Sequence, residues 1–264
     1  FLAVNPVLAK EWAPVAVEAG AKVIDLSGSC ITQPQAVLLV ADTNPQAWKK
    51  ESKIAVCPSS AAAQLAPVLG VMQRELGLER VVVSSYEAVS GAGKLGLDEL
   101  WDQTRAIFSQ REIIMEAFPH QIAFNCIPQI DVLTESGATR AEQRLATELR
   151  SILNLDQLRV SATSVRVPVL HGLAQALNVE TERYIPVAEL NQMFEALEGL
   201  CMMYADADYP TMLDAVGMDE VYIGRVRRDD SLPCGYNLWV VADNLRRGLA
   251  LNAVQIAELM VEQV

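Results

Sequence analysis

Histidine, a common metal ligand and acid–base group, is scarce in this chain, with 2 among 264 residues. So small a supply excludes a histidine-rich metal centre. The five cysteines are scattered and form no C-x-x-C pair, which argues against a zinc site and a disulfide framework. No apolar run approaches the roughly 18 residues of a membrane span, and no basic-then-apolar signal opens the chain. We therefore expect a cytoplasmic protein without bound metal or a membrane partner.

Positive charge is also in short supply. The net charge is -12 and the isoelectric point is about 4.7. So acidic a surface repels nucleic-acid phosphates and anionic lipid headgroups, and nucleic-acid partners are disfavoured. The hydrophobic fraction of 51% and the charged fraction of 20% are ordinary for a soluble α/β protein. The length favours one large domain or two interlocked domains.

Hydrophobic patterns predict an α/β fold with a mixed sheet. In the first part, helical spacing over residues 6–19 followed by an apolar strand at 21–27 is typical of a parallel sheet. Later segments, 159–170, 178–185, 220–229 and 236–243, read as strands of a mixed sheet with one face covered by helices. The opening Phe1-Leu2-Ala3-Val4 reads as the end of a buried strand, from which we expect a missing upstream segment.

Three further segments are predicted as helices. Residues 61–76 should form a helix that a serine caps and that Pro67 kinks or divides. The segment after GAGKLG should form an amphipathic helix from residue 97 onward, and the chain should close with one long helix over 245–264.

Six segments, in order along the chain, resemble the aspartate-semialdehyde dehydrogenases. They are RVVVSSYEAVSGAGKLGLDEL (80–100), IAFNCIPQID (122–131), AEQRLATELRSIL (141–153), VSATSVRVPVL (160–170), YIGRVRRD (222–229) and NLWVVADNLRRGLALNAVQIAE (237–258). The resemblance implies a partial Rossmann-like NAD(P)-binding domain, residues 1–57 with 243–264, and a catalytic and dimerisation domain, 58–242. It also implies NADP as cofactor, a homodimer and a role in amino-acid biosynthesis.

The reactive corner departs from the family pattern. That pattern is C-P-N-C-S-T with a glutamine four residues after the second cysteine, and here it is Cys57-Pro58-Ser59-Ser60-Ala61-Ala62 with Gln64. Ser60 therefore occupies the nucleophile position. A serine hydroxyl is a poor nucleophile without an adjacent base and cannot form the family's thioester. We interpret Ser60 as a helix N-cap and Cys57 as buried structure.

The base position has changed as well. The family places a histidine seven residues after its substrate-carboxylate arginine; here Arg166 is followed at that distance by Leu173. His171 lies two residues earlier, which in extended chain is about 6.5 Å away. It is a candidate replacement base only if the local loop differs.

The charged positions are kept in part. Glu87 stands where the family has the glutamine that orients the intermediate, and Ile31 where it has a phosphate-binding arginine. Glu142, Arg144 and Arg166 keep the charge types of the substrate-binding residues. An anion-binding side thus remains beside a dismantled reactive centre.

GAGKLG matches G-x-G-x-x-G, but REIIMEAFPH after it is not a clean second parallel strand, so we reject a Rossmann fingerprint here. By resemblance, Ser90, Gly91, Gly93 and Asn244 would lie against the nicotinamide end of NADP. Tight NADP binding by the given sequence is doubtful, because it has no counterpart of the family's opening glycine turn.

Three functions follow as hypotheses. The first is a non-catalytic homodimer, close to the Usg-type paralogues that lack the catalytic cysteine. The second is an NADP-dependent semialdehyde oxidoreductase that uses Ser60, Cys57 or His171. The third is a protein that binds a small anion, a dicarboxylate or phosphate, through Arg144 and Arg166.

Overall fold

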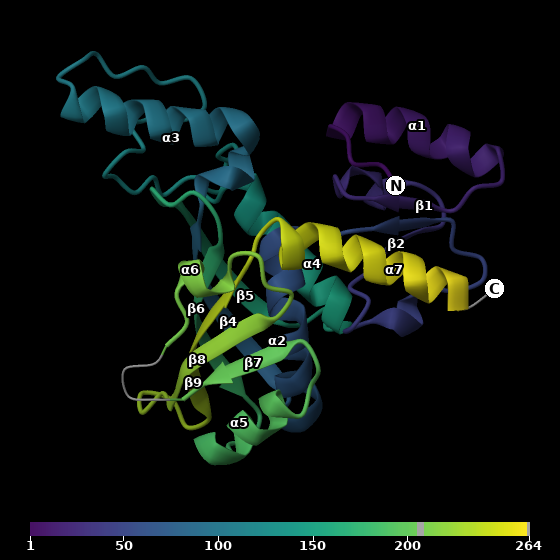
Figure 1. Cartoon of the computed structure of the whole chain (residues 1–264). Helices are drawn as coiled ribbons and strands as arrows, with labels where there is room; N and C mark the ends of the chain where they lie inside the picture. The colour runs from purple at the N-terminus through teal and green to yellow at the C-terminus, as the bar shows by residue number, and fades with distance from the viewer. Residues whose placement is uncertain (205–208, 263–264) are drawn as a thin grey trace.

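The computed structural model describes residues 1–204 and 209–262. They form an α/β structure with two separate sheets, one of three strands and one of six (Figure 1). The predicted α/β class with a mixed sheet is confirmed. The last two residues of the predicted closing helix, 263–264, lie outside the described residues.

The three-stranded sheet is parallel, with the order β1-β3-β2. Strands β1 (Val23–Asp25), β2 (Ala36–Leu38) and β3 (Ile54–Val56) are short and largely buried. Leu2 forms an isolated parallel bridge to Asp25, so the apolar start takes a strand position beside β1. Helix α1 (Pro6–Glu18) covers one face and α7 (Leu251–Glu262) the other, as a parallel sheet requires (Figure 1).

The six-stranded sheet is mixed, with the order β5-β4-β6-β9-β8-β7. The β4–β5 and β7–β8 pairs are parallel and the other pairs are antiparallel. The strands are β4 (Leu78–Glu87), β5 (Arg159–Arg166), β6 (Leu173–Thr181), β7 (Leu200–Met203), β8 (Val221–Arg228) and β9 (Gly235–Ala242). Helices α2 (Ser60–Leu76), α4 (Arg140–Leu153) and α5 (Val187–Glu195) lie on one face and build the main core with it.

Helix α3 (Gly93–Phe108) and the segment after it project from the body of the molecule (Figure 1). The helix begins at Gly93, four residues earlier than predicted, so most of GAGKLG forms its first turn. Because these residues open a helix that no second parallel strand follows directly, the rejection of a dinucleotide fingerprint is consistent with the structure.

Other boundaries correct the sequence-based prediction. Helix α2 runs unbroken through Pro67. The closing helix is divided into a π-helical turn, Arg246–Ala250, and α7. Strand β6 begins at Leu173 and ends at Thr181, whereas the pattern placed it at 178–185. Strand β7 and helices α5 and α6 (Met212–Ala215) were not predicted.

Candidate functional site

A cavity of about 230 Å³ lies at the N-terminal end of α2. Seven of the predicted site residues line it: Ser60, Glu87, Gly91, Arg144, Arg166, Leu173 and Asn244. Five others do not: Ile31, Ser90, Gly93, Glu142 and His171. The structure thus brings the nucleophile position, the base position and two arginines to one place.

The strand register explains how these residues meet. Glu87 at the end of β4 pairs with Arg166 of β5 on one side and with Leu173 of β6 on the other. Residues paired across a sheet project from the same face. All three side chains therefore lie on the face that α2 and α4 cover.

Ser60 is the first residue of α2, and the N-cap is its neighbour Ser59, whose Oγ accepts from Ala62 N. The interpretation of Ser60 as the N-cap is therefore wrong by one residue. The hydroxyl of Ser60 donates to the carbonyl oxygen of Asn244 at 3.0 Å. Gly248 packs so closely that a Cβ there would lie 2.7 Å from Ser60 Cβ. Ser60 is held as part of the packing between α2 and the closing segment.

Ser59 also joins α2 to α4 through Glu148, a residue that the sequence pattern did not single out. Both the amide nitrogen and the hydroxyl of Ser59 donate to the Glu148 carboxylate, the hydroxyl at 2.5 Å. Arg144, one turn earlier on α4, donates to the same carboxylate at 2.7 Å. The four-residue spacing of Arg144 and Glu148 on a predicted helix could have indicated this ion pair from the sequence.

Leu173 is buried, with 1% of its surface exposed, and its carbonyl oxygen accepts from Gln64 Nε2 at 3.2 Å. His171 precedes β6 and does not reach the cavity lining. Between them, Gly172 has φ +101° and donates its amide to Asn244 Oδ1 at 2.8 Å. The expectation of regular extended chain between His171 and Leu173 is therefore wrong, because the backbone at Gly172 is not extended.

Arg166 is 7% exposed and carries a charge that must be balanced. Its Nη1 donates to the carbonyl oxygen of Ala88 at 2.6 Å and lies 3.9 Å from Glu87 Oε2. Burial raises the pKa of Glu87, while Arg166 and a hydrogen bond from Ser85 oppose that rise. Burial likewise lowers the pKa of Arg166, against the opposing effect of Glu87.

Glu142 is used by the backbone and does not face the cavity. Its carboxylate accepts from the amides of Thr139 at 2.7 Å and Ser164 at 2.9 Å, completing a capping box at the start of α4. Ala141, which has no polar side chain, lines the cavity at this point instead.

Of the four residues predicted to face a nicotinamide, Ser90 and Asn244 are in contact with each other, and Gly91 and Asn244 line the cavity. Asn244 Nδ2 donates to Ser90 Oγ at 3.0 Å, which ties the end of β4 to the end of β9. Gly91 lies against Arg166, since a Cβ there would be 2.7 Å from Nη1. Gly93 has open space around it. Ser90 and Gly93, by contrast, do not line the cavity.

Two other candidates for chemistry are unsuited to it. Cys57 is fully buried, and burial raises the pKa of its thiol to about 12. Ile31 is exposed in a short 3₁₀ turn, Ser29–Thr32, and does not line the cavity. Within residues 1–204 and 209–262 no cluster of metal-ligating side chains occurs, and no helix there is long and apolar enough to cross a membrane.

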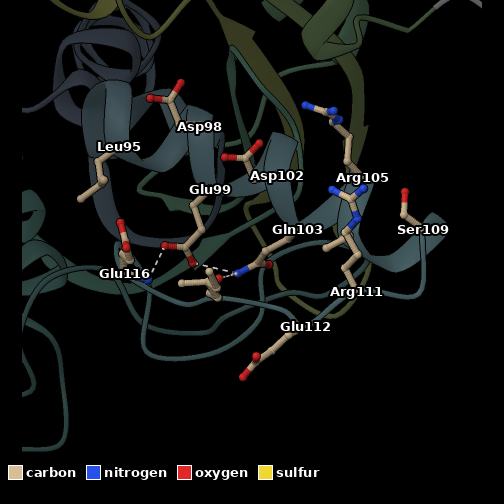
Figure 2. A pocket seen from close by; sticks show the side chains of 12 residues that line it. Leu95, Asp98, Glu99, Asp102, Gln103, Arg105, Ser109, Arg111, Glu112 and Glu116 are labelled. Atoms are coloured by element: carbon tan, nitrogen blue, oxygen red, sulfur yellow. Dashed lines mark hydrogen bonds between the residues drawn. The ribbon is translucent and has the colours of Figure 1, made fainter.

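A larger hollow, about 370 Å³, lies on the projecting α3 segment (Figure 2). Its centre is Glu99, which accepts from the amides of Glu116 and Ala117 and from Gln103 Nε2. These bonds fold the segment after α3 back onto the helix. None of the predicted site residues lies there, so we place the functional site at the α2 cavity.

Comparisons with known proteins identify the relatives of this chain. The family model described as "Semialdehyde dehydrogenase, dimerisation domain" matches residues 68–247. The aspartate-semialdehyde dehydrogenase of Aquifex aeolicus is 40% identical over 259 residues, which cover 96% of this chain and 76% of the relative. Aspartate-semialdehyde dehydrogenase 2 of Vibrio cholerae is 42% identical over 257 residues, with the same coverage.

Solved structures show the same relationship. The crystal structure of aspartate semialdehyde dehydrogenase II from Vibrio cholerae superposes with a TM-score of 0.95 at 41% identity, covering 98% of this chain and 78% of that one. A probable aspartate-semialdehyde dehydrogenase from Pseudomonas aeruginosa reaches 0.92 at 30% identity, with the same coverage. Sequence and fold agree, and the chain belongs to the aspartate-semialdehyde dehydrogenase family.

Proposed function

We propose that this protein is a non-catalytic, homodimeric member of its family, of the Usg type, whose cavity binds a ligand without converting it. The observation that carries the proposal is the bonding of Ser60. Its hydroxyl donates to a backbone carbonyl, and no histidine lines the cavity. A serine without a base is not activated for attack on an aldehyde.

A working oxidoreductase with altered residues is the second candidate, and the geometry gives it less support. Cys57 is buried with a thiol whose pKa is about 12, so almost none of it is thiolate at neutral pH. His171 lies outside the cavity lining and is separated from Leu173 by the bend at Gly172. Neither residue can supply the missing pair of reactive groups in this arrangement.

NADP is the cofactor that the family implies, and a solved structure from Candida albicans, 18% identical, is described with NADP. In this chain Gly91, Gly93 and the Ser90–Asn244 pair would hold the nicotinamide end. The cofactor would supply a hydride acceptor there. In the family reaction the hydride comes from a thiohemiacetal between the substrate and the nucleophile. This cavity has no residue that forms one, so a bound cofactor would receive no hydride.

The proposed homodimer has its own support. Apolar residues of the sheet face opposite α2 line a hollow of about 800 Å³; they include Val82, Ala174, Ala176 and Trp239. An exposed apolar surface of this kind is typical of a protein interface. The matched family model is itself described as a dimerisation domain. A cytoplasmic location and the absence of nucleic-acid partners stay predictions from composition.

The activity test uses the purified chain with aspartate semialdehyde, NADP and phosphate. We expect no formation of NADPH above a protein-free control, since loss of a general base alone costs about 10²–10⁴ in rate. Turnover by the wild type would refute the proposal. Cys57→Ala and His171→Ala variants would then show whether either residue carries that turnover.

A small-anion binding protein is the third candidate, and its two arginines do line the cavity. Each of them already has a carboxylate partner, Glu148 for Arg144 and Glu87 for Arg166. That pairing bears directly on which ligand the cavity can accept.

A further inference from the structure

Arg166 is the most deeply buried charge that faces the cavity. It projects from the end of β5 beneath Gly91, and its exposed surface is 7%. A buried guanidinium needs a partner of opposite charge, from a ligand or from the protein itself. The hydrogen bond to the carbonyl oxygen of Ala88 satisfies one N–H group but brings no net charge.

Glu87 provides that charge from within the chain. It lies directly opposite Arg166 in the parallel β4–β5 register, and its Oε2 is 3.9 Å from Nη1. Ser85, two residues earlier on the same face, donates to Glu87 Oε1 at 2.9 Å. Ser85 Oγ also lies 3.1 Å from Ser164 Oγ, so the row of polar residues along β4 and β5 holds the carboxylate in place.

The other charges that line the cavity do not replace this pair. Arg144 of α4 is bound to Glu148 by a charged hydrogen bond of 2.7 Å. Asp131, on the segment before α4, is exposed. The cavity is also lined by uncharged residues: Ser60 on α2, Leu173 on β6 and Asn244 after β9.

We infer that Glu87 determines the ligand class of this cavity: it neutralises Arg166 from within, so that the wild-type cavity rejects a ligand carboxylate and accepts an uncharged polar group beside Arg166. This inference deepens the proposed function and rests on it, because it names the ligand of the same site. A carboxylate that enters would have to displace Glu87 or lie beside it, and two carboxylates at that range repel each other. Removing the charge of Glu87 turns the same cavity into an anion site.

The experiment measures succinate binding by calorimetry near neutral pH for the wild type, Glu87→Gln and a double variant, Glu87→Gln with Arg166→Gln. We expect Glu87→Gln to bind succinate at least about ten-fold more tightly than the wild type, and the double variant to lose that gain. The exposed acid variant Glu112→Gln is the matched control and should bind like the wild type. Uncharged succinamide should bind the wild type and Glu87→Gln equally. A folded Glu87→Gln variant that binds succinate no better than the wild type overturns the inference.

A second measurement uses only the wild type and a probe whose charge is constant, inorganic sulfate. As pH falls, Glu87, whose pKa is raised by burial, takes up a proton at a higher pH than an ordinary glutamate does and leaves Arg166 without a counter-charge. Sulfate should then bind more tightly, with uptake of one proton. Neither histidine lines the cavity, so a pH-independent affinity overturns the inference. The dehydrogenase assay reports the proposed function separately, since it does not depend on succinate or sulfate.

Discussion

The two ends of the α2 cavity, a reactive end and a charged end, differ in the contacts that hold their side chains. At the reactive end, Ser60 and Leu173 are uncharged, and they are held by contacts to Gly248, Asn244 and Gln64. At the charged end, Arg144 and Arg166 each lie beside a carboxylate, that of Glu148 and that of Glu87. The difference lies in what each side chain does for the fold.

A nucleophile and a base are needed only for the reaction. When the reaction is no longer required, smaller or apolar residues can take their places at little cost to stability. A buried arginine is different, because removing one partner of a buried pair leaves the other uncompensated. Charged residues can therefore outlast the chemistry that they once served, provided that the protein supplies their counter-ions.

The largest effect should come from breaking the charged end. We expect Arg166→Gln to lower the free energy of unfolding by about 3 kcal/mol near neutral pH, because the Glu87 carboxylate would lose its cationic partner and would have to stay buried unpaired or take up a proton. Urea denaturation followed by circular dichroism measures this change. The control is Arg159→Gln at the other end of β5, where an exposed arginine lies 3.3 Å from Glu79 and Glu180. The control should lose less than about 1 kcal/mol, and equal losses would contradict the comparison.

This pairing could not be predicted from the sequence. Glu87 and Arg166 meet only because β4 and β5 are parallel and in one particular register. By contrast, α4 was predictable, since Thr139 and Glu142 form a capping box before an amphipathic run. That same capping role removes Glu142 from the cavity, which a charge pattern alone does not indicate.

Other differences have equally local causes. Two adjacent serines, Ser59 and Ser60, stand at the start of α2, and only the backbone geometry shows that Ser59 is the cap. Strand β7 has four residues, too few for a visible alternation. The α/β class, the mixed sheet and the cluster of Ser60, Leu173 and Arg166 were all predicted, because the long strands and the family segments carry strong patterns.

A smaller effect is expected at the reactive end, from filling the space beside Ser60. Gly248→Ala should lower the free energy of unfolding by about 1–3 kcal/mol, because the new methyl group would lie 2.7 Å from Ser60 Cβ and 3.1 Å from Ser60 Cα. The matched control is Gly70→Ala in α2, where the nearest atom is 3.4 Å away and alanine favours the helix. The control should keep or gain stability in the same urea titration. A neutral Gly248→Ala would mean that Ser60 is not held by packing.

The smallest effect on activity should come from restoring the nucleophile alone. In Ser60→Cys the new thiol would stand at the N-terminus of α2, where the helix dipole lowers its pKa, so iodoacetamide should label it faster than buried Cys57. Peptide mapping by mass spectrometry measures the labelling, with exposed Cys126 as the internal reference. Oxidation of aspartate semialdehyde should nevertheless stay at the background level, because Leu173 cannot act as a base. Turnover by this variant would show that the cavity still supplies a proton acceptor. The reactive end would then lack only its nucleophile.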